Sequence, residues 1–400
     1  MLPSKFTLPI PYRWFDFLGD KLDALGVPIV SLDQKSLCRA AEKITRLSDF
    51  GDPYYQEGLS VLLHSIEQDA QLRFYGKLVI RIIIINYLTQ RLLFVRAMKQ
   101  TPKNTQGALK EPFIITGLHR SGTTFLLRML SLDPRHAGIP FWRLFRPFSI
   151  PGWLDLRRIR SAVELSILHP IFMNIDTKHI IRGKKPEESA WMMGLTFHSI
   201  VYWILAPVST YTEWLLTVDM TNYYQDYSLL LQAHQQAFPE KSMVLKAPDH
   251  TPDVDMLLSV IPNARVIQLH RDPTTCVISL SSLFYSTHGA LTEDIQSKRM
   301  FEVNKKMVAH FIQANKRARQ SMDIDRSIFD IEYESLVADP IGTIKQIYHF
   351  FKVPWSDEYE QCLQHFIKSQ LQSEHKRHYY TPEQFGQESQ ELVAFFDALK

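Results

Sequence analysis

The sequence predicts an α/β protein in which a mainly parallel β-sheet is flanked by helices. From residue 112 onwards, short apolar runs alternate with segments of helical periodicity, as in proteins whose parallel sheet is covered by helices on both faces. Before residue 100 the pattern is helical only, with apolar residues three and four positions apart. We therefore expect an N-terminal helical extension over residues 1–110 and an α/β domain over residues 111–400.

The composition is that of a globular protein. The 400 residues are 45% hydrophobic and 22% charged, which is enough to bury a large core. A net charge of +3 is too small to indicate a nucleic-acid partner. Cys38, Cys276 and Cys362 lie far apart without the spacing of metal ligands. Proline and charge interrupt the start of the chain, so no export signal is expected, and we predict a cytoplasmic protein without a metal site.

Three helices are predicted in the N-terminal extension. Two are amphipathic, over Lys35–Leu47 and Tyr55–Ile66. The third, Leu78–Phe94, is apolar but is interrupted by two arginines and an asparagine, so it falls short of the roughly 18 clean residues of a membrane span. We expect a buried helix here; the alternative is a helix that lies on a membrane or binds an acyl chain. Residues 101–112 then form a polar surface connection.

Four strands are predicted, over residues 112–117, 242–248, 264–273 and 327–333. Ligands of parallel sheets bind at the carboxyl ends of the strands. Polar clusters follow these strands directly, so we expect the clusters to share one crevice.

The segment Gly117–Thr124 (GLHRSGTT) follows the first strand and opens a helix. Backbone N–H groups and the helix dipole favour an anion at such a turn. The segment is similar to a P-loop, but Thr123 occupies the position of the lysine that binds nucleoside triphosphates. Arg120, inside the loop, supplies the positive charge instead, and a guanidinium can bind a terminal anion through paired hydrogen bonds. This favours a short phosphate–sulfate tail bound without a metal ion.

Arg271 and Ser279 form a second candidate anion site: Arg271 stands at the end of a predicted strand and Ser279 follows eight residues later, about two helical turns, so we expect both to face the same crevice. Together with the first loop they resemble the PAPS-dependent sulfotransferases (PAPS is 3′-phosphoadenosine 5′-phosphosulfate). Three further segments agree in the same order: VLKAPDH, FDIEYESLVADPIGTIKQIYHFF and EHKRHYYTPEQFG. The resemblance covers about residues 112–386. His119 departs from it, because the family usually has proline there.

The resemblance implies a P-loop-type sheet and transfer of a sulfuryl group from PAPS to a hydroxyl or amine. It also implies which residues bind the donor. Those around the 5′-phosphosulfate are Arg120, Ser121, Gly122, Thr123 and Thr124. Arg271 and Ser279 would bind the 3′-phosphate, Tyr333 would lie near the adenine, and Lys376 or Arg377 would close over the 3′-phosphate.

Sulfuryl transfer needs in-line positioning, stabilised charge and removal of the acceptor proton. Arg120 and Lys246 are the candidates for stabilising charge. For the general base we predict His250, which has a near-neutral pKa in water and directly follows the strand that carries Lys246. Glu188 is the alternative. His198 and Asp272 are expected to serve packing and helix capping, respectively.

Residues 138–230 are rich in aromatic side chains and are predicted to form a helical lid on the acceptor side. Most of these aromatics should belong to the core, but their abundance favours an apolar small molecule or lipid as acceptor. Such an acceptor is compatible with contact to a membrane surface but does not require it. Two other functions remain open at this point: a P-loop kinase or nucleoside triphosphatase, and a nucleotide-binding protein without catalysis.

Overall fold

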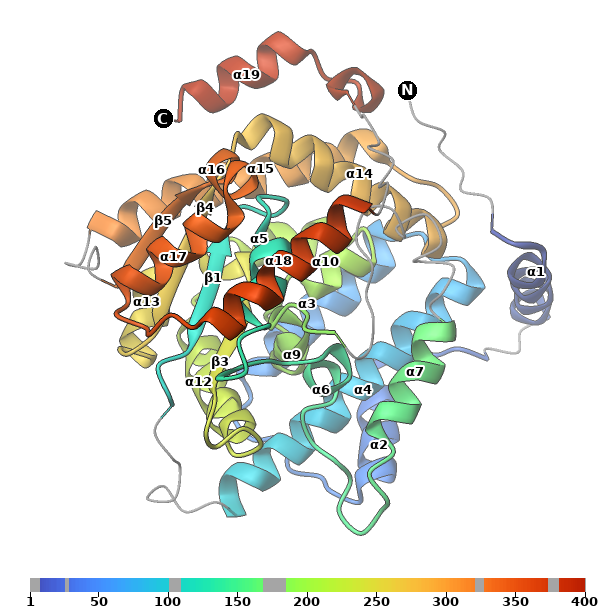
Figure 1. Ribbon diagram of the computed structural model, residues 1–400. Helices are drawn as coiled ribbons and strands as arrows, with labels where there is room; N and C mark the ends of the chain where they lie inside the picture. The colour runs from blue at the N-terminus through green and yellow to red at the C-terminus, as the bar shows by residue number, and fades with distance from the viewer. Residues whose placement is uncertain are drawn as a thin grey trace.

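The protein is built around a five-stranded parallel sheet surrounded by helices (Figure 1). The computed structural model describes residues 8–25, 29–100, 109–167, 185–320, 327–372 and 381–399. The predicted α/β class with a parallel sheet is therefore confirmed.

The strands lie in the order β2-β3-β1-β4-β5, and each described pairing is parallel. Their bounds are β1 Phe113–Gly117, β2 His136–Gly138, β3 Ser242–Lys246, β4 Arg265–His270 and β5 Ile328–Glu332. Four of them match the predicted strands. The edge strand β2 was not predicted, because three residues are too short to show a periodic pattern.

Both faces of the sheet are buried, which explains why β1 begins with three consecutive apolar residues. Phe113 and Ile115 face one core, together with α5 (Thr123–Leu130), α17 (Pro340–Phe350) and α18 (Asp357–Gln372). Ile114 faces the other core, with α13 (Val254–Val260), α14 (Pro273–Leu291) and α15 (Ser297–Gln320). Side chains alternate between the faces of a strand, so a strand covered on both sides needs an unbroken apolar run.

The remaining helices lie before, between and after the strands. Those before β1 are α1 Ile10–Ala24, α2 Gln34–Thr45, α3 Tyr54–Asp69 and α4 Phe74–Gln100. Those between β2 and β3 are α6 Phe141–Phe145, α7 Arg157–Ile167, α9 Ala190–Met193, η2 Gly194–Thr196, α10 Val201–Leu205, α11 Ser209–Leu215 and α12 Thr221–Gln235. The rest are η3 Pro248–His250, α16 Tyr333–Ala338, η4 Pro382–Phe385 and α19 Ser389–Asp397.

Helix α4 is a core helix, as predicted. It is long and apolar enough to cross a membrane, but 72% of its most apolar stretch is buried inside the protein. Arg91 in this helix is 1% exposed and donates to the carbonyl oxygens of Phe50 and Asp52, both at 2.8 Å, with the Asp226 carboxylate 3.5 Å away. The charge within the apolar stretch is therefore compensated inside the protein.

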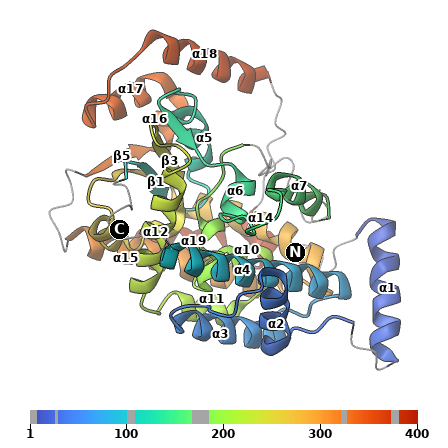
Figure 2. The same ribbon diagram turned by 90° about the horizontal axis from the view of Figure 1, so that it is seen from below.

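The helices divide between the two faces of the sheet. Figure 2 shows α5, α17 and α18 on one side of the strands and α2, α3 and α4 on the other. Residues of α2, α3 and α4 belong to the same core as Ile114 of β1. The N-terminal helices thus lie on the same side of the sheet as α13, α14 and α15. The carboxyl ends of the strands lead into the polar clusters described next.

Candidate active site

The loop between β1 and α5 is shaped by glycines at positive φ. Gly117 has φ of 125° and Gly122 has φ of 95°. A Cβ at Gly117 would lie 2.3 Å from the Leu269 carbonyl oxygen, and one at Gly122 would lie 2.8 Å from the Tyr333 ring. Arg120 also adopts a positive φ, 72°. The glycines therefore allow this turn to pack against β4 and the end of β5 while Arg120 is held within it.

Four of the predicted donor-binding residues meet at the carboxyl ends of β1, β4 and β5. The Arg120 Nε donates to the Ser279 hydroxyl at 3.1 Å. The Arg271 Nη1 donates to the Arg120 carbonyl oxygen at 2.6 Å, and its guanidinium carbon lies 3.9 Å from the centre of the Tyr333 ring. Ser279 thus contacts Arg120; its contact with the 3′-phosphate, together with Arg271, stays a prediction.

The cluster fits an anionic donor. Burial lowers the pKa of Arg120, Glu188 acts against this shift, and the neighbouring Arg271 lowers the pKa further. The Ser121 hydroxyl is fully buried and has no hydrogen-bond partner among the described residues. Two adjacent guanidinium groups and an unsatisfied hydroxyl at the start of a helix are suited to bind phosphate or sulfate oxygens.

A second cluster lies at the end of β3. The buried Lys246 ammonium forms an ion pair and hydrogen bond with the Glu188 carboxylate. Ser189 N donates to the Lys246 carbonyl oxygen at 2.9 Å, which fixes the Glu188 segment to the strand. Glu188 also interacts electrostatically with Arg120 and with Asp249. Glu188 therefore lies near Arg120, although many residues separate them in sequence.

His250 lies in a different environment from the one expected of a general base. Its side chain is fully buried, and its ring packs edge-on against Tyr227 with centroids 4.6 Å apart. Nδ1 lies 3.2 Å from the Tyr224 hydroxyl. Burial lowers the pKa of His250 to about 3. An imidazole that is fully buried among tyrosines of α12 has no exposed surface toward an acceptor, which argues against the role of base that we predicted for it.

Two contacts of the site were not predicted from the sequence. His119 Nε2 lies 3.4 Å from the Asp249 carboxylate, and both side chains are almost fully buried. Burial raises the pKa of Asp249. The Thr251 hydroxyl donates to the Gly117 carbonyl oxygen and accepts from the Gly117 N–H, each at 2.9 Å. Thr251 therefore holds the segment after β3 against the phosphate loop. Of these contacts, only that of His119 had a signal in the sequence, because His119 stands where the related family usually has proline.

Thr123, Thr124, Asp272 and His198 are the remaining predicted residues that the structure describes. Thr123 is buried and Thr124 half-buried in the first turn of α5. Lys376 and Arg377 lie outside the described residues. Asp272 caps α14 by accepting from Thr274 N and Thr275 N, and His198 packs between Tyr54 and Trp214, both as expected. Within the described ranges, no group of three or more His, Cys, Asp or Glu side chains is arranged to hold a metal ion.

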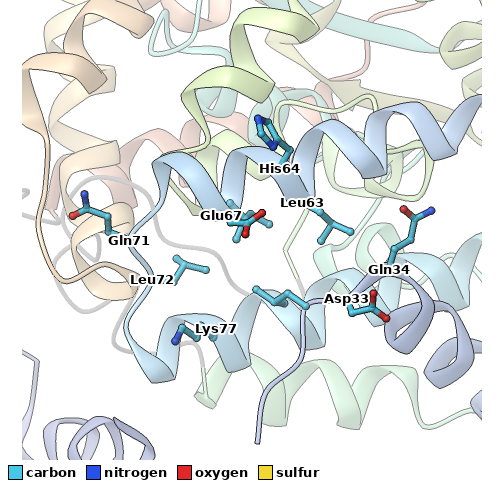
Figure 3. Close-up of a pocket in the computed structure, with 10 residues that line it drawn as sticks. Asp33, Gln34, Leu63, His64, Glu67, Gln71, Leu72 and Lys77 are labelled. Carbon is cyan, nitrogen blue, oxygen red and sulfur yellow. The ribbon is translucent and has the colours of Figure 1, made fainter. Parts of the chain in front are cut away.

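A cavity of about 700 Å³ lies elsewhere, between α2, α3 and the start of α4 (Figure 3). Its wall combines apolar side chains such as Leu63 and Leu72 with Asp33, Glu67 and Lys77. None of its lining residues belongs to the two clusters at the strand ends. We therefore do not include it in the active site.

The sequence of this chain matches the sulfotransferase family over residues 112–357, and the chain belongs to that family. The matched region contains the phosphate loop, both clusters and Tyr333, which supports the interpretation that they form one site.

Two curated relatives are mycobacterial proteins, from Mycobacterium bovis and Mycobacterium tuberculosis, each named omega-hydroxy-beta-dihydromenaquinone-9 sulfotransferase Stf3. Each is 24% identical to this chain over 282 residues, and the matched region covers 65% of this chain and 66% of the relative.

Two solved structures resemble most of the chain. Sulfotransferase STF1 from Mycobacterium tuberculosis H37Rv has a TM-score of 0.73 and 27% identity, covering 92% of this chain and 98% of that chain. Sulfotransferase STF9 from Mycobacterium avium has a TM-score of 0.78 and 22% identity, covering 92% and 96%. The N-terminal helices are thus largely included in the shared fold.

Proposed function

We propose that this protein transfers a sulfuryl group from PAPS to a hydroxyl group of an apolar, lipid-like acceptor. The observation that carries the proposal is the convergence of Arg120, Ser279, Arg271 and Tyr333 at the strand ends, directly beside the Glu188–Lys246 pair. The first group of residues suits a nucleotide with two anionic groups, and the second suits proton removal and charge stabilisation.

On the donor side, the phosphate loop binds the 5′-phosphosulfate. The N–H groups at the start of α5, the Ser121 hydroxyl and Arg120 bind its oxygens, whereas Arg271 binds the 3′-phosphate. Tyr333 lies against the Arg271 guanidinium, and its ring is positioned at the edge of the nucleotide site. A donor with two separate anionic groups would account for the two adjacent arginines.

In the reaction, the acceptor oxygen forms a bond to sulfur while the bond between sulfur and the 5′-phosphate oxygen breaks. The products are the sulfate ester and 3′-phosphoadenosine 5′-phosphate (PAP). Lys246 and Arg120 stabilise the negative charge that develops on the leaving oxygen and the sulfuryl oxygens. The acceptor proton moves to a carboxylate, and we assign this role to Glu188, because Glu188 pairs with Lys246 near Arg120, whereas His250 is buried against Tyr224 and Tyr227.

The acceptor class is supported by two observations. The Stf3 relatives are named for a hydroxylated menaquinone derivative, a lipid with a hydroxyl group. The chain between β2 and β3 is rich in aromatic residues, although most of them, such as Trp191, Phe197 and Trp203, are buried in the core. An apolar acceptor with one hydroxyl group suits both.

Calorimetric titration tests the donor assignment. We expect PAP to bind more tightly than ATP with Mg²⁺, because Thr123 replaces the lysine that a triphosphate requires. Tighter binding of ATP with Mg²⁺ would contradict the proposal and would favour a kinase or nucleoside triphosphatase.

A further inference from the structure

Large apolar side chains are exposed mainly in two segments. Of the seventeen such side chains among the described residues, thirteen lie between residues 10 and 29 or between 153 and 163. Single exposed apolar residues are ordinary, but a concentration of them marks a surface that contacts something other than water.

Helix α1 carries the first group, with its apolar face directed outward. The exposed side chains Ile10, Trp14, Phe17 and Leu18 recur at the spacing of one helical face, and Leu25 follows directly after the helix. Trp14 is 63% exposed and Leu25 is 76% exposed. A surface helix normally directs such a face toward the core, so α1 has the opposite orientation.

Contacts of the inward face fix this orientation. The Asp16 carboxylate accepts from Tyr75 N at 2.7 Å and lies 3.8 Å from the Arg73 guanidinium. Gly19 packs directly on Phe74, where a Cβ would overlap the ring. Because Asp16 and Gly19 must face α4, the apolar side chains of α1 cannot turn inward.

Helix α7 and the turn before it repeat this arrangement. Glu164 pairs with Arg146, and Arg157 donates to the Pro147 carbonyl oxygen at 2.6 Å, so polar contacts hold the helix in place. Its exposed apolar side chains are Trp153, Leu154, Leu156, Ile159 and Val163. Figures 1 and 2 both place α7 and α1 toward the same side of the molecule.

The charges within the two faces are positive. Lys21 lies on the outward face of α1, four residues after Phe17, with its ammonium 5.6 Å from the Phe17 ring. Arg158 and Arg160 are exposed beside Ile159 on α7. At the edge of the α1 face, Arg13 and Asp20 are both exposed and have opposite charges. Near α7, Asp155 and Glu164 pair with Arg157 and Arg160.

We propose that the outward faces of α1 and of residues 153–163 form a surface that docks on an anionic lipid bilayer. Tryptophan, leucine and isoleucine would enter the headgroup region, while the cations would contact anionic headgroups. A second copy of the chain fits less well, since two such faces would bring like charges together. The docking surface goes beyond the proposed reaction, and its test requires neither donor nor acceptor.

The test is co-sedimentation of the full chain with vesicles of phosphatidylglycerol and phosphatidylcholine, compared with vesicles of phosphatidylcholine alone. We expect binding to the anionic vesicles and weaker binding to the neutral ones. The double variants Trp14→Ser/Leu18→Ser and Trp153→Ser/Leu154→Ser should each weaken binding by about tenfold or more, because exposed apolar side chains that would enter the lipid are lost.

The matched control is Val337→Ser/Val393→Ser, which removes two exposed apolar side chains outside both faces and should leave vesicle binding unchanged. PAP affinity, measured for every variant, verifies folding. Equal binding of all variants, or no binding of the unmodified chain, would overturn the proposal. The proposal would also be overturned if sedimentation velocity showed a dimer that the Trp14→Ser/Leu18→Ser variant dissociates, while vesicle binding stays the same.

Discussion

The choice of base depends on two residues that the sequence could not distinguish. Glu188→Gln should lower the single-turnover rate of sulfuryl transfer by about 10²- to 10⁴-fold, the range for loss of a general base. PAP affinity should be retained or rise, because the substitution removes a negative charge that pairs with Lys246 and interacts with Arg120. Glu213→Gln, a surface carboxylate paired with Lys306, is the control and should leave the rate unchanged.

His250→Gln distinguishes the two assignments. Because His250 is buried against Tyr224 and Tyr227, its replacement should mainly reduce stability and have less effect on the rate per folded molecule than Glu188→Gln. A collapsed rate in a folded His250→Gln protein, with a near-normal rate in Glu188→Gln, would restore the base that we predicted from the sequence.

Arg271 tests the second anion site. Arg271→Ala should weaken PAP binding by about 1.5 to 3 kcal/mol, the range for hydrogen bonds to charged groups, and leave AMP binding nearly unchanged. Arg265→Ala is the matched control, since Arg265 begins the same strand at its opposite end and pairs with Glu111. Equal losses for PAP and AMP, measured by calorimetry, would refute the contact between Arg271 and the 3′-phosphate.

At the scale of the element, the phosphate loop depends on backbone conformations that only glycine adopts freely. Gly122→Ala and Gly152→Ala both place a Cβ at positive φ, which should cost about 1 to 2 kcal/mol of unfolding free energy in each case. Only the Cβ at position 122 meets the Tyr333 ring; none of the atoms described lies within 4 Å at position 152.

Gly122→Ala should therefore also weaken PAP binding by about tenfold, which corresponds to about 1.4 kcal/mol. Urea denaturation and PAP titration separate the two effects. Equal PAP affinities in the two variants would show that the loop tolerates displacement of Tyr333.

The packing of α14 against α10 predicts a pH dependence. His288 is buried, its Nε2–H donates to the Trp203 carbonyl oxygen at 2.6 Å, and burial lowers its pKa to about 4. Below the unfolded pKa of about 6.5, the unfolded chain binds a proton that the folded chain does not, so the stability from neutral His288 declines as the pH falls from about 6.5 toward 4.

The difference in unfolding free energy between the unmodified protein and His288→Gln should therefore shrink by about 2 kcal/mol between pH 7.5 and pH 5. Urea denaturation at both pH values measures it. A difference that does not change with pH would mean that His288 is protonated within the folded protein.

At the scale of the whole molecule, the sequence predicted the features that depend on local order. The strands β1, β3, β4 and β5 and the phosphate loop follow from apolar runs, glycines and spacing within one segment. The identification of α4 as a buried helix succeeded for the same reason, since charges within its apolar stretch need partners inside a protein.

Features that depend on tertiary packing could not be predicted in this way. The Glu188–Lys246 pair arises because residues 185–189 cross to the end of β3, which no local pattern indicates. His250 looks like a base in the sequence, but α12 contributes the tyrosines that bury it. The outward apolar face of α1 depends on Asp16 and Gly19, whose contacts are visible only in three dimensions.

The central claim is that the two clusters at the strand ends together transfer a sulfuryl group. The most direct measurement is an incubation with PAPS carrying ³⁵S and an ω-hydroxylated prenyl quinone in detergent micelles. We predict that the label moves to the organic phase while an equal amount of PAP forms, and that Glu188→Gln abolishes most of this transfer. Tight PAP binding with no transfer of label to the quinone or to any hydroxylated lipid would contradict the account.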